Sequence, residues 1–396
     1  MTAEKIEMPE AATRSLLAKS AFAGLDGISH LCAGGETPVL MSHSDAVAGF
    51  FVDKADGMIG RERMMQLHGQ VKKRLGTLLD LPAGDIAFFL NSSDGVATAL
   101  SALDLRSGDN IVVARGDFNS LALNASLAAQ VSGAELRFAG DKMVFNEDEI
   151  AAEVDRNTAA ILVSHVSHLT GRRCELSRLR GIADACGARL IVDVSHSLGA
   201  MPIAGDLCDV VISCAYKWQL GVHGCAVFAV NSARWPDLIA RTVGWHAIED
   251  TNDWRNADGF CARVDATRFE AGNPPFMALY VLDNGLATLM AHEAAAREMH
   301  ILGLTAQIKS VLNDHGVPVL TPASPEERAG NVAFAAEDPM SIVEALRRRN
   351  VFVWGGENRV RISAHIYNDT DDVTAFAAAL GEIDQGLLPH PKREPR

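Results

Sequence analysis

Short apolar runs alternate with helical stretches between about residues 80 and 230. The runs cover residues 86–90, 111–114, 160–163, 190–192 and 210–212. Uninterrupted apolar runs of this length are typical of strands in a sheet that is covered on both faces. Because strands and helices alternate, we predict an α/β fold with a mainly parallel, doubly wound sheet. A further run at residues 225–230 follows a glycine-rich turn and is expected to pair antiparallel.

The pattern changes after about residue 272. Pro274-Pro275 interrupts the chain, and a long helix is predicted from residue 278 to about residue 313. Strands are expected near residues 317–320, 331–334, 351–353 and 360–362, and a last helix over residues 371–380. The first residues resemble a helical arm. We therefore predict an N-terminal arm (1–25), a large domain (26–275) and a smaller C-terminal α+β domain (276–396).

Polar residues follow every predicted strand of the large domain. These clusters are residues 91–95, 115–118, 164–168, 193–196 and 213–217. In a doubly wound sheet the ligand lies at the carboxyl ends of the strands. The clusters are therefore expected to converge on one site.

The first cluster suits phosphate binding. Ser92 or Ser93 is a good N-cap for the apolar helical run that follows. The free backbone N–H groups and the positive end of a helix together form an anion site. An ordinary capped helix explains the same residues, so this motif is weak when taken alone.

Two later clusters place a carboxylate and an amine at neighbouring strand ends. Asp193 ends a strongly apolar run, and a carboxylate there needs a partner because burying it alone is costly. A protonated pyridine nitrogen is one such partner, and a capped turn is the alternative. Lys217 follows the next strand in an apolar, aromatic setting, where an amine can act as a Schiff-base nucleophile. A solvent-facing loop lysine is the alternative for this residue.

Composition and charge argue against several classes of function. The chain has 396 residues, of which 48% are hydrophobic, enough for one large core and a smaller domain. Its net charge of -14, with no basic stripe outside the extreme C-terminus, argues against nucleic-acid binding. Neither a signal-peptide pattern nor an apolar run of about 18 residues is evident, so we expect a cytoplasmic protein with no membrane association.

Metal and nucleotide motifs are also missing from the sequence. The seven cysteines are scattered without a CxxC pair, and the spacing of His165, His168 and His196 fits no zinc pattern, so no metal site is predicted. A nucleotide-binding dehydrogenase would need GxGxxG after the first strand, and residues 90–96 do not supply it. The P-loop and GxSxG signatures are absent as well.

Three motifs together resemble the class V aminotransferase family of fold-type I pyridoxal 5′-phosphate (PLP) enzymes. They are Asp193-Val-Ser-His196 with Ser213-Cys-Ala-Tyr-Lys217, then Arg268-Phe-Glu-Ala-Gly-Asn273, then Arg361-Ile-Ser-Ala-His-Ile-Tyr-Asn368. The family includes cysteine desulfurases, isopenicillin N epimerase and kynureninase. The likeness extends from His30 to about Leu380.

The resemblance implies a role for each matching residue. Lys217 would hold PLP as an aldimine, Asp193 would pair with the pyridine nitrogen, and His196 and Ser167 would reach the ring hydroxyl. The remaining implied contacts are the following: Phe118 stacks on the ring; Ser92, Ser93, Cys214 and Tyr216 lie at the phosphate; Asn273 reaches the phosphate of a neighbouring subunit; and Arg361, with His30 and Trp245, contacts a small amino-acid substrate. The role of Asn273 implies a homodimer with its sites at the subunit interface.

The cofactor does not fix the reaction, because PLP weakens whichever α-carbon bond is aligned with its ring. Cysteine desulfurases carry a mobile-loop cysteine shortly before the carboxylate-binding arginine, and residues 353–361 hold none. This favours a lyase (β-elimination, C–S or similar) or other α-proton chemistry with Lys217 as the base. Transamination ranks second and kynureninase-like hydrolysis third. A PLP-binding regulator is the non-enzyme alternative, which the presence of both Lys217 and Asp193 disfavours.

Overall fold

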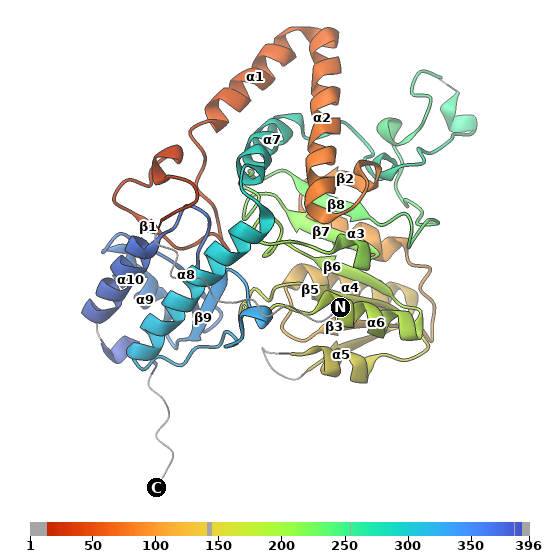
Figure 1. Cartoon of the computed structure of the whole chain (residues 1–396). Coiled ribbons are helices and arrows are strands. Elements are labelled where there is room, and N and C mark those ends of the chain that lie inside the picture. The colour runs from red at the N-terminus through yellow and green to blue at the C-terminus, as the bar shows by residue number, and fades with distance from the viewer. Residues whose placement is uncertain (1–13, 141–144, 254, 384, 390–396) are drawn as a thin grey trace.

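A seven-stranded sheet forms the centre of the molecule in the computed structural model, which describes residues 14–140, 145–253, 255–383 and 385–389 (Figure 1). The strand order is β2 (Ile86–Phe89), β8 (Ala226–Val230), β7 (Val210–Cys214), β6 (Arg189–Asp193), β5 (Thr158–Ser164), β3 (Asn110–Ala114) and β4 (Glu135–Ala139). Strand β8 is antiparallel to both of its neighbours, and the other neighbouring pairs are parallel. The predicted α/β fold and the antiparallel pairing of residues 225–230 are confirmed.

Alternate side chains of each strand enter two different cores. In β3, Val112 belongs to the core on one face of the sheet, whereas Ile111 and Val113 belong to the core on the other. Strand β6 divides in the same way, with Val192 in the first core and Ile191 in the second. Because both faces are covered, neither set of positions tolerates polar residues, which accounts for the uninterrupted apolar runs.

Helices connect the strands and cover both faces. They are α3 (Ser92–Ala102), α4 (Asn119–Ser132), α5 (Glu147–Glu153) and α6 (Leu176–Cys186). Helices α1 (His43–Ala55) and α2 (Gly57–Leu79) form a hairpin whose tip rises away from the body of the molecule (Figure 1). The apolar runs did not predict this hairpin or strand β4, whose side chains are mostly not buried because it lies at the sheet edge.

A smaller unit lies beside the central sheet. Its antiparallel sheet has the order β11 (Trp354–Gly356), β12 (Arg359–Ser363), β9 (Asn331–Ala335). Strand β10 (Val351–Phe352) pairs in parallel with β1 (Ser29–His30), so a segment from the start of the chain joins this unit. Helices α9 (Pro339–Arg347) and α10 (Thr370–Glu382) pack on a separate core with Leu304 and Phe334. The division of the chain into domains remains a prediction.

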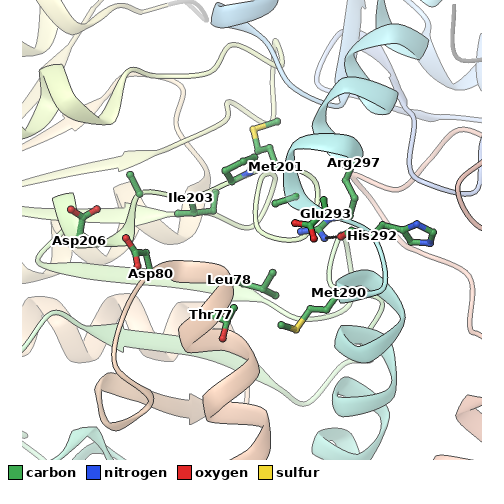
Figure 2. Close-up of a pocket in the computed structure, with 13 residues that line it drawn as sticks. Thr77, Leu78, Asp80, Met201, Ile203, Asp206, Met290, His292, Glu293 and Arg297 are labelled. Atoms are coloured by element: carbon green, nitrogen blue, oxygen red, sulfur yellow. Dashed lines mark hydrogen bonds between the residues drawn. The ribbon is translucent and has the colours of Figure 1, made fainter. Parts of the chain in front are cut away.

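The single long helix predicted over residues 278–313 is wrong, because the chain forms α7 (Phe276–Met290) and α8 (Ala294–Asp314). The guanidinium of the buried Arg297 donates to the backbone carbonyls of Leu289 and His292 at the end of α7, and to that of Gly199. Figure 2 shows Arg297 beside His292 and Glu293 at this junction, where they line a cavity of about 630 Å³. A buried arginine needs acceptors, and the free carbonyls of a helix end supply them.

Three further local predictions need correction. Residues 317–320 form no strand, only a bridge between Val319 and Phe334. The predicted helical arm lies partly outside the described residues (1–13). Residues 14–25 form no α-helix but a 3₁₀ turn, Lys19–Ala21, and a bridge from Phe22 to Leu40, because the backbone before the turn bonds to Ile366. The N-cap of α3 is Asn91 rather than Ser92 or Ser93, and its Oδ1 accepts from the Asp94 N–H at 3.0 Å. Within the described residues, no helix combines the length and apolar character needed to cross a bilayer.

Candidate active site

The amine of Lys217 lies in a buried, partly aromatic pocket three residues beyond β7. The residue is only 8% exposed, and its Nζ lies 3.2 Å from His196 Nε2. The rings of Phe118 and Tyr216 both have their centroids 5.7 Å from the same nitrogen. The Thr37 hydroxyl donates to the Lys217 carbonyl at 2.7 Å, which fixes the backbone at this point. A desolvated, anchored amine of this kind is suited to nucleophilic and proton-transfer chemistry.

Asp193 is the last residue of β6 and is buried without a charged partner. Its Oδ1 accepts from the Ser195 N–H at 2.7 Å, and among the described residues it forms no ion pair. Burial raises the pKa of the Asp193 carboxyl, although the hydrogen bonds from Ser195 and the charge of Lys217 act in the opposite direction. A protonated ring nitrogen at this position would supply the missing positive charge.

Arg361 lies in β12 and presents a partly unused guanidinium. Its Nη1 donates to the His168 carbonyl at 2.9 Å, whereas its buried Nε has no hydrogen-bond partner among the described residues. Burial lowers the pKa of Arg361 to about 10, which still leaves it charged near neutral pH. A Cβ at Gly34 would lie 3.3 Å from this Nε, so the glycine leaves the space beside it open. A carboxylate fits such a free guanidinium edge.

The residues predicted at the phosphate lie at the strand ends, but their role remains a prediction. Ser92 is the first residue of α3, and the Ser93 hydroxyl is 2.7 Å from that of Ser120. The Cys214 N–H donates to Ser195 Oγ at 3.0 Å, which joins the end of β7 to the turn after Asp193. The Tyr216 ring stacks on His223, with a centroid separation of 4.2 Å.

Phe118 and Ser167 flank the pocket from two other strand ends. Phe118 is 39% exposed. Its ring lies edge-to-face with the His168 ring, with a centroid separation of 5.3 Å, so one face of the Phe118 ring is available for stacking on a flat ligand. The Ser167 hydroxyl accepts from the N–H groups of Leu169 and Thr170 and shapes the turn that it begins. Its predicted contact with the cofactor hydroxyl is untested.

Three predicted residues are not brought to Lys217 by contacts within one chain. The His30 ring bonds to the Tyr367 hydroxyl at 2.9 Å, and burial lowers the pKa of His30 to about 4. Trp245 and Asn273 both contact Arg61 of α2, the former through its ring at 5.3 Å and the latter by a 2.6 Å hydrogen bond. The roles of all three remain predictions, and that of Asn273 is predicted toward a neighbouring subunit.

Two residues of the site were missed. Asp117 follows β3 and accepts from the N–H groups of Ser164 and Phe118, so it orients the aromatic ring; burial raises its pKa to about 6. It lies in the polar cluster 115–118, and its position at a strand end is the signal that could identify it. Asn331, whose amide contacts His196, begins β9 and has no sequence signal of its own.

A separate buried cluster joins α2 to the segment before α7. His68 and His246 surround the carboxylate of Glu270, with Nε2 atoms 2.9 and 3.4 Å from Oε2. Among the described residues this is the one group that could hold a metal ion. Lys72 Nζ, however, lies 3.1 Å from Glu270 Oε1 and already balances its charge. We therefore interpret the cluster as a structural ion network.

The fold and site together define an α/β protein with a buried amine and a buried carboxylate at neighbouring strand ends of the central sheet, and with a guanidinium edge on β12 of the smaller unit. The family model described as aminotransferase class-V matches residues 59–376. The chain therefore belongs to the class V aminotransferase family. Its cofactor is pyridoxal 5′-phosphate, as predicted, and the unpaired Asp193 carboxylate and the Lys217 amine fit that group.

The similar proteins include a kynureninase and a probable cysteine desulfurase. A kynureninase from Pseudomonas fluorescens is 25% identical over 253 residues, 61% of this chain and 60% of that enzyme, so the chain spans less than two thirds of its length. A probable cysteine desulfurase from Pyrococcus abyssi is 23% identical over 344 residues, covering 81% and 84% of the two chains.

Solved structures share the fold over almost the whole chain. The apo cysteine desulfurase from Thermococcus onnurineus NA1 superposes with a TM-score of 0.84 at 20% identity, covering 96% of this chain and 100% of that one. The cystine C-S lyase C-DES, in complex with its product cysteine persulfide, gives 0.83 at 18% identity and covers 91% and 99%. At this level of identity the likeness establishes the fold alone.

Proposed function

We propose that the protein is a PLP-dependent lyase that removes the α-proton of a small amino acid and expels a group from its β-carbon. The observation that carries this proposal is the presence of a buried amine, Lys217, and a buried carboxylate, Asp193, at the ends of the adjacent strands β7 and β6. The free Nε of Arg361 supports an amino acid as the substrate, because it offers a site for the α-carboxylate.

Each of these residues has a separate task. Asp193 would keep a proton on the ring nitrogen of the cofactor, His196 would donate to the ring oxygen, and Phe118 would stack on the ring. When bound, the cofactor draws electrons from the α-carbon bond that is aligned with its ring. Arg361 orients the substrate through its α-carboxylate, and Lys217 Nζ takes the α-proton as general base.

The choice of a lyase over a persulfide-forming desulfurase is supported by the segment before Arg361. Strands β11 and β12 are joined by a tight turn at Glu357 and Asn358, which have φ values of 51° and 56°. Two consecutive left-handed residues are typical of a two-residue hairpin turn. Such a hairpin has no room for a mobile loop that carries a cysteine.

The test is to incubate the PLP-loaded protein with a panel of small amino acids, including cysteine, cystine and serine. Formation of pyruvate and ammonia is the expected result. Transfer of the amino group to a keto acid would instead establish an aminotransferase, and release of anthranilate from kynurenine would establish the kynureninase-like alternative. Racemisation in deuterated water, without elimination, would show that the protein removes the α-proton but expels no group from the β-carbon.

Replacing Arg361 by lysine is expected to lower kcat/KM for the amino-acid substrate by about 10- to 100-fold, mainly through KM. The ammonium keeps the charge but loses the planar fork that can hold a carboxylate with two hydrogen bonds. Steady-state kinetics measure the effect. Arg349→Lys, at a partly exposed arginine that pairs with Glu382, is the matched control and should leave both constants unchanged. An unchanged KM in Arg361→Lys would show that Arg361 does not bind the substrate carboxylate.

We also propose a homodimer formed through the α1–α2 hairpin and the surface around Asn273. The hairpin exposes large apolar side chains, with Phe51 59%, Met58 74% and Ile59 66% exposed. Apolar residues that gather on the tip of a protruding hairpin indicate a contact surface. Asn273 and Trp245 lie beside the same helix, α2, so a partner held there could receive them in its own site.

The double substitution Met58→Glu with Ile59→Lys is expected to convert the dimer to a monomer. Burying two new charges without partners opposes association, and we expect the dimer Kd to rise by about 100-fold or more. Sedimentation velocity at micromolar concentration measures the change. Val131→Glu, at an 81% exposed position on α4, serves as the control. An unchanged dimer Kd in the double variant would show that the interface does not include the tip of the α1–α2 hairpin.

A further inference from the structure

A chain of hydrogen bonds links the Lys217 amine to the smaller unit. His196 Nε2 lies 3.2 Å from Lys217 Nζ, and His196 Nδ1 lies 3.0 Å from Asn331 Nδ2. The Ser363 hydroxyl then donates to Asn331 Oδ1 at 2.8 Å. Asn331 begins β9 and Ser363 ends β12, where the two residues are direct partners across the sheet. All four side chains are buried.

We propose that Asn331 is a positioning residue that fixes His196 as the tautomer with its proton on Nε2, the nitrogen that faces Lys217. This inference rests on the proposed function, in which that N–H donates to the ring oxygen of the cofactor. A neutral imidazole has one donor and one acceptor nitrogen. Since Nδ1 accepts from the Asn331 amide, the proton lies on Nε2. Burial and the charges of Lys217 and Arg361 hold the pKa of His196 well below its usual range, so the ring is neutral.

The surroundings of the Asn331 side chain determine which end of the amide faces His196. A Cβ built on Gly34 would lie 2.6 Å from Asn331 Oδ1 and 3.3 Å from Arg361 Nε, so the amide oxygen and the guanidinium both border the space beside this glycine. A partial negative charge is favoured beside a buried cation, and the opposite orientation would turn the two amide protons toward it. The nitrogen end is thereby directed at His196 Nδ1.

The link also explains why Gly34 carries no side chain. A Cβ there would approach the Ser363 hydroxyl to 2.7 Å, in addition to its clash with Asn331 Oδ1. The strand that carries Arg361 carries Ser363 two residues later. The group that would hold the substrate carboxylate and the group that orients His196 are thus parts of the same strand, β12.

The test reads the tautomer directly. Long-range ¹H–¹⁵N spectra of histidine-labelled, PLP-loaded protein are recorded for the wild type and for Asn331→Asp, with His196→Gln used to assign the signal. We expect Nε2–H in the wild type. In Asn331→Asp we expect Nδ1–H, because a carboxylate only accepts, together with a shift of the pH midpoint of the visible cofactor band by about one unit, a tenfold change.

Asn231→Asp is the matched control, because its amide donates to the Asp206 carbonyl away from the site and should change neither signal. Ser363→Ala is the second variant in case Asn331→Asp does not fold; it frees the amide to rotate and should give a mixture of tautomers. A wild-type proton on Nδ1, or a folded Asn331→Asp protein with unchanged tautomer and midpoint, would overturn the inference. Failure to bind PLP would count against the proposed function alone, since the tautomer can then be read in the cofactor-free Lys217→Met chain, where no ammonium faces Nε2 as a competing donor.

Discussion

Replacing Lys217 by alanine is expected to lower kcat/KM by about 10³-fold or more, because we propose this residue as both the attachment point of the cofactor and the general base. Its amine is the one that contacts His196 and lies between the Phe118 and Tyr216 rings. Steady-state kinetics on the best substrate of the amino-acid panel measure the loss. The protein should still fold, since Lys217 Nζ forms no ion pair among the described residues.

Lys73→Ala is the control for this substitution. Lys73 lies on the exposed side of α2, and its replacement should leave kcat/KM unchanged. Adding a small primary amine to the Lys217→Ala protein should restore part of the proton transfer. More than a tenth of the wild-type activity in Lys217→Ala would place the base on a different residue.

Replacing Glu270 by glutamine is expected to lower the free energy of unfolding by about 3–5 kcal/mol, the cost of leaving one partner of a buried ion pair uncompensated. Burial alone would raise the pKa of Glu270, but His246, His68 and the charge of Lys72 together hold it well below its usual range. The carboxylate also accepts from the Phe88 N–H at 3.1 Å, so the cluster ties α2 to β2. Urea unfolding followed by circular dichroism measures the loss.

Two variants make the Glu270 result specific. Glu175→Gln changes an exposed carboxylate and should shift the free energy of unfolding by less than about 0.5 kcal/mol. The double variant Lys72→Met with Glu270→Gln removes both charges and should recover much of the loss. A loss below about 1 kcal/mol in Glu270→Gln alone would show that the cluster is not an ion network, and would reopen the question of a metal ion among its ligands.

The central sheet could be predicted because its strands are buried on both faces, so apolar runs such as Leu190–Val192 have few alternatives. The break between α7 and α8 could not, because residues 291–293 include neither proline nor glycine. The chain ends α7 there because Arg297, four residues after Glu293, takes the helix-end carbonyls. The bonds to Leu289 and His292 are local, but the bond that holds Arg297 to the Gly199 carbonyl is tertiary, and none of the three follows a recognised sequence pattern.

The residues of the site also divide into those that the sequence predicts and those that it does not. Lys217, Asp193 and Phe118 follow strands, and the topology of the sheet alone brings strand ends together. Asn331, Gly34 and Trp354 reach the site from segments distant in sequence, and their roles depend on how the smaller unit docks against the sheet. Trp245 and Asn273 lie at the surface within one chain, so their predicted roles depend on a partner that a single sequence does not describe.

The most direct test of the account is to reduce the PLP-loaded protein with borohydride, digest it and locate the modified lysine by mass spectrometry. The account predicts one phosphopyridoxyl group, on Lys217, and none in the Lys217→Ala protein. Modification of a different lysine, such as Lys72 or Lys309, or a stable coloured adduct in Lys217→Ala, would contradict it.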